Sequence, residues 1–357
     1  MHPLDRYHRQ MLLPTIGSVG QEAIAKSTVF VAGCGALGTV AIDLLARAGV
    51  GTLVIVDRDV VEETNLQRQT LFVERDAARA IPKAEAAKTR VALVNSNVRV
   101  RAFVEEIAAD TLPELAEGCD VLVDGLDNFQ TRYLLNDYAV REGIPYLYGA
   151  AVATTGMSMP VLPAVEPQRG VKWTAEQSTP CLRCMFPEPP PPGQAETCDT
   201  AGVLGMVTAA IAGHMATQTI KLLVGAIDDL DRSLLSIDIW ANETKRMVTP
   251  AASNPECPCC GNQEFEFLSS TNDSTHTMLC GQNAVQVRPP RTADLNLTSL
   301  ATKLAAHGTF VVADGALRGE LKAEEASIIV FPDGRAIISG STDFSWAQSI
   351  YDRLIGQ

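Results

Sequence analysis

Four cysteines in this chain stand in two pairs with the spacing of metal-binding knuckles. The first pair is Cys181 and Cys184, and the second is Cys257 and Cys260, after a gap of 72 residues. Four thiolates can close a tetrahedral zinc site, which leaves no open position for catalysis. We therefore predict a structural Zn²⁺ site that staples distant parts of one domain. A redox CxxC motif and two unrelated pairs are the alternatives, and Cys259 offers a less usual ligand.

A further thiol, Cys198, follows a proline-rich segment and belongs to neither pair. Proline fixes its own φ angle and has no N–H donor, so residues 185–197 are predicted to form an exposed, mobile arm. Cys198 stands just before an apolar helical stretch at 202–225, and a thiol near a helix N-terminus has a lowered pKa. The hypothesis is a thiol free to act in a later catalytic step. The alternative is a buried cysteine that caps the helix.

A glycine-rich turn, GCGALG at 33–38, lies between an apolar strand pattern and a helical pattern. Its glycines Gly33, Gly35 and Gly38 allow a tight turn and a close approach of the backbone to phosphate, beside the positive end of a helix. Asp57 closes the next predicted strand, where a carboxylate holds ribose hydroxyls. The motif predicts a nucleotide site but does not name the nucleotide. NAD is the default, and a purely structural turn is the alternative.

The residues that follow favour a triphosphate over NAD. An enzyme that splits a triphosphate needs cations where charge develops, and a carboxylate for Mg²⁺. The segments 57–69, 81–88 and 123–128 supply both, and each follows a predicted strand or lies close after one. Asp127 is the predicted magnesium ligand, although each charge taken singly is typical of a solvated surface. The candidate nucleotide-binding residues are Gly33, Gly35, Gly38, Asp57, Asp59, Asn65, Arg68, Gln69, Lys83 and Asp127.

The elements that position these residues alternate between strand and helix from Ser27 onward. This order predicts an α/β fold with a doubly wound, mostly parallel, Rossmann-like sheet. The predicted strands are 28–33, 51–57, 98–104, 119–125, 145–152 and 234–240. We assign residues 1–266 to this domain, residues 267–277 to a polar linker, and residues 278–357 to a small α+β domain of unknown role. In that last domain we expect a strand, a helix, two strands and a helix, with a hairpin turn at FPDGRAI.

Composition excludes several classes of function. The net charge is −13 and no stretch is strongly basic, which argues against a nucleic-acid surface. No run of eighteen uncharged apolar residues and no signal-peptide core occurs, so we expect no membrane span and a cytoplasmic location. In the cytosol thiols stay reduced, which favours metal binding or chemistry over disulfides for the nine cysteines.

The motifs together resemble the ThiF/MoeB/HesA adenylyltransferases, bacterial relatives of ubiquitin-activating enzymes. The resemblance covers roughly residues 3–266. It rests on RYHRQ at 6–10, the glycine turn, NLQRQ at 65–69, PKAEAAK at 82–88, VDGLDN at 123–128, the paired knuckles and TCDTAGVLG at 197–205.

The resemblance implies an activity that the motifs alone do not name. The enzyme would use ATP and Mg²⁺ to adenylylate the C-terminal Gly-Gly carboxylate of a small ubiquitin-like sulfur carrier of the MoaD/ThiS type. Arg68, Gln69, Lys83 and Asp127 would act at the phosphates and the metal, and Asp57 at the ribose. Arg9 would reach the ATP of a partner subunit, which implies a homodimer.

The resemblance also implies a later sulfur transfer. Cys198 matches a cysteine that in some members bonds to the carrier, and a cysteine desulfurase or another donor would supply sulfur. Adenylylation of another ubiquitin-like modifier or of a peptide is the alternative. An NAD-dependent oxidoreductase and a non-catalytic zinc scaffold are more distant ones, because neither uses Arg9, Arg68 and Lys83.

Overall fold

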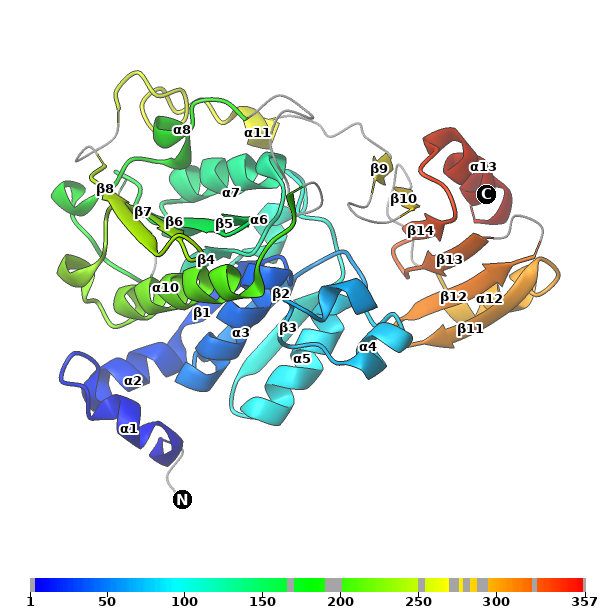
Figure 1. Cartoon of the computed structure of the whole chain (residues 1–357), viewed down its shortest axis with the longest axis horizontal. Coiled ribbons are helices and arrows are strands. Elements are labelled where there is room, and N and C mark those ends of the chain that lie inside the picture. The colour runs from blue at the N-terminus through cyan, green and yellow to red at the C-terminus, as the bar shows by residue number, and fades with distance from the viewer. Residues whose placement is uncertain are drawn as a thin grey trace. The chain divides into compact units, whose positions relative to one another are not determined.

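The computed structural model describes most of the chain and resolves it into two compact units, Met1–Thr271 and Asn272–Gln357 (Figure 1). The described residues are 4–165, 170–189, 201–249, 254–269, 276–278, 283–287, 295–322 and 326–355. Among these residues, no helix combines the length and the apolarity needed to cross a lipid bilayer.

The first unit is built on an eight-stranded sheet in the order β3-β2-β1-β4-β5-β6-β7-β8. Strands β3 to β5 in that order pair in parallel, and β6, β7 and β8 continue the sheet in antiparallel fashion. The predicted α/β class with a large, mainly parallel sheet is thereby confirmed. The strands are β1 (Thr28–Ala32), β2 (Thr52–Val56), β3 (Arg99–Phe103), β4 (Val121–Asp124), β5 (Tyr146–Val152), β6 (Thr155–Val161), β7 (Leu234–Asp238) and β8 (Glu243–Met247).

Helices cover both faces of this sheet, which is why β1, β2 and β4 are almost entirely buried. Side chains alternate between two cores, so that Val29 and Val31 pack into one and Phe30 and Ala32 into the other. The first core includes α2 (Gly17–Lys26), α3 (Ala36–Ala48), α5 (Lys83–Val94) and α10 (Gly205–Leu223). The second includes α6 (Leu112–Leu115), α7 (Phe129–Glu142), α8 (Leu182–Met185) and α11 (Glu266–Ser269).

Shorter elements connect the sheet and its helices. The 3-10 turns are η1 (Asp5–Tyr7), η2 (Glu63–Asn65), η3 (Ala175–Gln177) and η4 (Ile227–Asp229), and the short helices are α1 (His8–Met11) and α4 (Glu74–Ala78). The arm predicted at 185–197 starts inside α8, which ends at Met185, and residues 190–197 lie outside the described residues.

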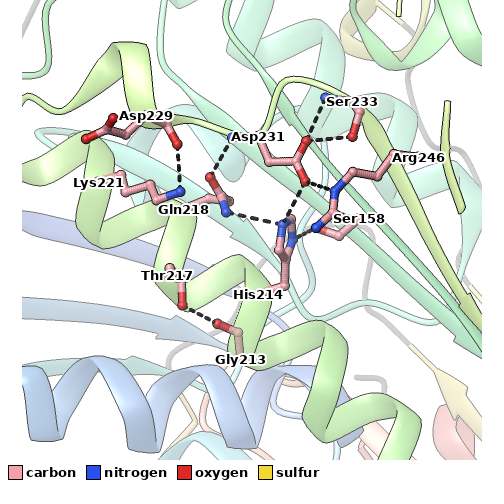
Figure 2. A network of polar contacts seen from close by, with 10 residues as sticks. All are labelled: Ser158, Gly213, His214, Thr217, Gln218, Lys221, Asp229, Asp231, Ser233 and Arg246. Atoms are coloured by element: carbon pink, nitrogen blue, oxygen red, sulfur yellow. Dashed lines mark hydrogen bonds and ion pairs between the residues drawn. The ribbon is translucent and has the colours of Figure 1, made fainter. Parts of the chain in front are cut away.

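A polar network joins α10 to the antiparallel end of the sheet (Figure 2). His214 on α10 lies 3.3 Å from the hydroxyl of Ser158 through Nδ1 and 3.6 Å from a carboxylate oxygen of Asp231 through Nε2. The carboxylate of Asp231 also accepts hydrogen bonds from Ser233 and, at 2.9 Å, from Arg246 on β8. The network therefore ties one helix to β6, to β8 and to the segment before β7.

The second unit contains a six-stranded antiparallel sheet in the order β11-β12-β13-β14-β10-β9. Helices α12 (Leu297–Leu304) and α13 (Phe344–Leu354) contribute Leu304, Ile350 and Leu354 to its core. The expected PDG hairpin is present: β13 and β14 pair around a turn in which Gly334 has a φ of 88°. The strands are β9 (His276–Met278), β10 (Ala284–Val287), β11 (Gly308–Ala313), β12 (Ala316–Leu321), β13 (Ala326–Val330) and β14 (Ala336–Ser339).

Candidate functional site

The glycine turn connects β1 to α3 with almost no free space around it. Gly33 has a φ of 87°, which only glycine adopts readily. A Cβ on Gly38 would lie 2.0 Å from the carbonyl oxygen of Gly33, and a Cβ on Gly125 would lie 2.6 Å from the same oxygen. The turn therefore packs against the segment that follows β4, and the carboxyl ends of β1 and β4 form one edge of the sheet.

Asp57, the first residue after β2, holds the glycine turn in place. Its carboxylate accepts hydrogen bonds from the N–H of Cys34 at 2.6 Å and from the N–H of Asp59 at 2.8 Å. Burial raises the pKa of Asp57, while the nearby charge of Lys83 opposes the rise. The structure thus brings the predicted ribose-binding carboxylate directly beside the predicted phosphate turn.

Lys83, at the start of α5, is the cation closest to these carboxylates. Its side chain is buried, and Nζ lies 3.1 Å from a carboxylate oxygen of Asp59, while its backbone N–H donates to the carbonyl of Asp59 at 2.9 Å. Burial alone would lower the pKa of Lys83, but Asp59 and Asp57 outweigh burial and raise that pKa above its usual value. Lys83 therefore keeps its positive charge at this edge of the sheet.

Two further charged groups complete the edge, and one of them was missed from the sequence. Asp127 is exposed after β4 and acts electrostatically on both Lys83 and Arg58. Arg58 lies between the two predicted aspartates in sequence and pairs with Glu106 at 2.8 Å. Its position two residues after the buried strand β2 was the available signal.

The segment 65–69 forms a compact turn near the same edge. The carbonyl of Asn65 accepts from the N–H groups of Arg68 at 3.1 Å and of Gln69 at 2.9 Å, and Asn65 and Gln69 are both buried. The side-chain oxygen of Gln69 is buried and makes no hydrogen bond with the described residues. Arg68 is held more loosely, because Nη1 donates to the carbonyl of Thr64 at an exposed position. This turn adjoins the N-terminus of α10, where a Cβ on Gly205 would lie 3.1 Å from the carbonyl oxygen of Gln67.

The two aspartates of VDGLDN have different surroundings. Asp124 is wholly buried and its carboxylate accepts from Tyr146 at 2.6 Å, from the N–H of Leu126 at 2.9 Å and from Nε of Arg132 at 3.2 Å. Asp127 is exposed beside the cations. Asp127 is therefore the carboxylate available to a metal ion, and Asp124 anchors the turn.

The two cysteine knuckles meet at a second location, against α7 and α8. The four sulfur atoms of Cys181, Cys184, Cys257 and Cys260 all lie within 4.8 Å of one another. Measured separations are 3.9 Å for Cys181–Cys184, 3.6 Å for Cys181–Cys257 and 3.3 Å for Cys184–Cys260. A zinc tetrahedron with ligands at about 2.3 Å has edges of about 3.8 Å. The donor set and its dimensions therefore fit Zn²⁺.

The structure decides the position of the ambiguous fifth cysteine. Cys259 is wholly buried and outside the cluster, and its sulfur accepts a hydrogen bond from the amide of Asn136 at 3.3 Å. The amide oxygen of Asn136 in turn accepts from the N–H of Leu182 at 2.7 Å. Cys259 thus belongs to the packing of the knuckles on α7.

The two remaining predicted residues are Arg9 and Cys198. Arg9 lies exposed on α1 and, within the described part of the chain, makes no hydrogen bond or ion pair with the other predicted site residues. Cys198 lies outside the described residues.

Comparison with known proteins identifies the class to which this arrangement belongs. The ThiF family model matches residues 7–259. The chain belongs to the ThiF family. This confirms the resemblance inferred from the motifs.

Curated ThiF-family relatives include proteins that match most of the chain. The sulfur carrier protein ThiS adenylyltransferase of Bacillus subtilis is 39% identical over 351 residues, which is 98% of this chain and 99% of the relative. The SAMP-activating enzyme E1 of Haloferax volcanii is 40% identical over 258 residues, which is 72% of this chain and 89% of the relative. The similarity to the Bacillus subtilis protein extends through the second unit of the structure. The similarity to the Haloferax volcanii protein covers only part of the chain.

Solved structures agree on the fold of the ThiF-family part. The crystal structure of E. coli MccB with ATP has a TM-score of 0.58, with 22% identity over 72% of this chain and 74% of that chain. At this level of identity the likeness supports the fold alone.

Proposed function

We propose that the chain is an ATP-dependent adenylyltransferase acting on the C-terminal Gly-Gly carboxylate of a ubiquitin-like sulfur carrier. The observation that carries this proposal is the 39% identity to the ThiS adenylyltransferase over 98% of the chain. The cluster of Lys83, Asp59 and Asp57 around a glycine turn supports it, because the cluster offers a nucleotide both backbone donors and a buried cation.

The reaction needs little covalent help from the protein. A carboxylate oxygen of the carrier attacks the α-phosphorus of ATP, the bond between that phosphorus and the bridging oxygen breaks, and pyrophosphate leaves. Lys83, Arg68 and Gln69 would stabilise the negative charge that grows on the phosphate oxygens, and Gly33, Gly35 and Gly38 would let the backbone approach them. Positioning and charge neutralisation would supply most of the rate.

Two metal ions belong to this proposal. Asp127 would hold Mg²⁺, which neutralises phosphate charge when bound; Asp127 is the exposed carboxylate beside Lys83 and Arg58. Cys181, Cys184, Cys257 and Cys260 would hold Zn²⁺, a closed structural site that ties residues of α8 to the turn at 254–262.

The partners remain proposals as well. Arg9 is exposed and makes no hydrogen bond or ion pair with the other site residues that the structure describes, so its side chain would be free to reach a second subunit in a homodimer. Cys198 would take part in a later sulfur-transfer step with a cysteine desulfurase or another donor. The cytoplasmic location and the absence of nucleic-acid partners stay predictions from the sequence.

Another ubiquitin-like modifier is the second candidate substrate. The 40% identity to the SAMP-activating enzyme favours it over a peptide.

ATP–pyrophosphate exchange with a panel of Gly-Gly-ended carriers tests the proposal. We expect exchange with one carrier and none when its last glycine is removed. Arg68→Ala should lower the rate by roughly 100-fold, as loss of one transition-state contact does. Arg47→Ala, which removes a surface arginine paired with Asp43 on α3, is the matched control and should leave the rate unchanged. No exchange with any carrier, in protein that binds ATP, would overturn the proposal.

The zinc assignment has its own matched pair of variants. Cys181→Ser removes a member of the sulfur cluster, and Cys259→Ser removes a buried sulfur outside it. We expect the first variant to lose its equivalent of zinc and the second to keep it, as measured by native mass spectrometry. Equal zinc content in the two variants would contradict the ligand set.

A further inference from the structure

The loop that carries Asp127 is hydrogen-bonded to two buried charged side chains, Asp124 and Arg132, that have no role in the proposed reaction. This loop, residues 125–128, connects β4 to α7. The N–H of Gly125 donates to the carbonyl of Ala32 at 2.7 Å, and the side chain of Asn128 accepts from the N–H of Thr131 at 2.9 Å. Both ends of the loop are thus fixed, one to β1 and the other to the start of α7.

Leu126, the residue before Asp127, is held at both of its backbone polar groups. Its N–H donates to the carboxylate of Asp124 at 2.9 Å, and its carbonyl accepts from Nη2 of Arg132 at 2.6 Å. Since Arg132 also pairs with Asp124 at 3.2 Å, the ion pair closes around the backbone of Leu126. Asp127 follows directly, so these bonds restrict the backbone immediately before it.

The ion pair is in turn oriented by groups on β5. Tyr146 donates to Asp124 at 2.6 Å, and Nη2 of Arg132 donates to the carbonyl of Gly149 at 3.1 Å. The ring of Tyr148 lies 5.6 Å from the guanidinium carbon of Arg132. Nε and Nη2 of Arg132 and both carboxylate oxygens of Asp124 therefore have hydrogen-bond partners, which offset the cost of burying the two charges.

We propose that Asp124, Arg132 and Tyr146 form a clamp that presets the Asp127 loop before the nucleotide binds. The three are positioning residues, since they act on the reaction through Leu126 and Asp127. The clamp also sets Gly125 against Gly33, where no Cβ would fit, so the glycine turn and the metal-binding carboxylate move as one piece. The magnesium part of this inference rests on the proposed function, whereas the ordering of the loop does not.

The clamp differs from a pair that serves stability alone. A buried ion pair can often be replaced by apolar residues with little loss, so stability does not require it. What an apolar replacement cannot do is bind the N–H and the carbonyl of Leu126. The signature of a clamp is therefore local order at residues 125–128.

Tyr146→Phe is the variant that tests the clamp, because it removes one hydroxyl and keeps the ring. Tyr133→Phe is the matched control: Tyr133 is also wholly buried, and its hydroxyl donates to the carbonyl of Phe186 at 2.8 Å, away from the loop. Amide hydrogen exchange of the segment 125–131, measured without nucleotide, is the first readout. We expect about fivefold faster exchange in Tyr146→Phe, which matches the loss of one hydrogen bond, and no change in Tyr133→Phe.

The second readout is the affinity for Mg²⁺ in the presence of ATP, which is measured by calorimetry. Tyr146→Phe should weaken it severalfold and leave ATP binding in excess chelator unchanged. Arg132→Lys, which keeps a charge opposite Asp124 but cannot span two carbonyls, should act in the same direction if it folds. Equal rates of amide hydrogen exchange at residues 125–131 in Tyr146→Phe and Tyr133→Phe would overturn the proposal of a clamp. Absence of carrier adenylylation by the wild type would instead count against the proposed function and leave the exchange result intact.

Discussion

Two aspartates in the first unit each pair with an arginine, and the two ion pairs differ in how far they are exposed to water. Asp124 is fully buried with Arg132, and burial raises the pKa of Asp124 although Arg132 and Tyr146 oppose the rise. Asp231 pairs with Arg246, whose side chain is 59% exposed. There, hydrogen bonds from Ser233 and Arg246 outweigh partial burial and lower the pKa of Asp231 to about 2.

The two networks have different structural roles: the network of Asp124 orders a loop, and the network of Asp231 connects elements at the protein surface. Asp124 and Arg132 hold the backbone of Leu126 beside the candidate site. Asp231 and Arg246 join β8 to the segment before β7, where the guanidinium of Arg246 is exposed to water. The buried pair therefore lies where the proposed chemistry needs fixed geometry.

The largest expected difference comes from removing each arginine. Arg132→Met leaves Asp124 buried without its counter-charge, and we expect a loss of about 3–5 kcal/mol in the free energy of unfolding. Arg246→Met removes an exposed partner, and the expected loss is at most about 1 kcal/mol. Urea unfolding of both variants at constant zinc measures the difference. Similar losses of unfolding free energy in the two variants would show that the buried and the exposed ion pair contribute equally to stability, and would contradict this distinction.

A pair of glycines offers the next largest effect, again with one member in each region. A Cβ on Gly38 would lie 2.0 Å from the carbonyl oxygen of Gly33, whereas a Cβ on Gly213, beside His214 on α10, meets nothing within 4 Å. Gly38→Ala should therefore cost about 1–3 kcal/mol and weaken nucleotide binding. Gly213→Ala should stabilise the protein by about 0.5–1 kcal/mol, because glycine is unfavourable inside a helix. Thermal unfolding and ATP binding check both; a stabilising Gly38→Ala would rule out the tight turn.

Local spacing was sufficient to predict several parts of the molecule. The strand–turn–helix pattern around Gly33 placed β1 and α3, because side-chain periodicity and glycine are read over a few residues. The two CxxC pairs predicted the sulfur cluster, because the spacing of each pair is also read over a few residues. Their joining across 72 residues was an inference from zinc chemistry, not from the fold.

Features set by tertiary neighbours were not predictable from the sequence. β6 contains Gly156 and Pro160, and β8 is exposed along its whole length, so neither shows an apolar strand pattern. The partnership of Asp124 with Tyr146 spans 22 residues and depends on β4 and β5 lying side by side. The different environments of Asp124 and Asp127 arise from the same packing.

The smallest expected effect is a change in pH dependence at the antiparallel end. Burial lowers the pKa of His214, and the positive charges of Arg246 and Lys221 lower it further. The negative charge of Asp231 raises this pKa but offsets only part of the decrease. The unfolded chain therefore takes up this proton first as the pH falls below about 6.5, so that stability declines in the window below that value. His214→Gln should flatten this decline, and replacing the exposed His307 controls for the loss of an imidazole elsewhere. Unfolding free energies at pH 7.5 and pH 5.5 measure it. A decline that is as steep in His214→Gln as in the wild type would mean that His214, which Figure 2 shows in the network, does not cause the loss of stability at low pH.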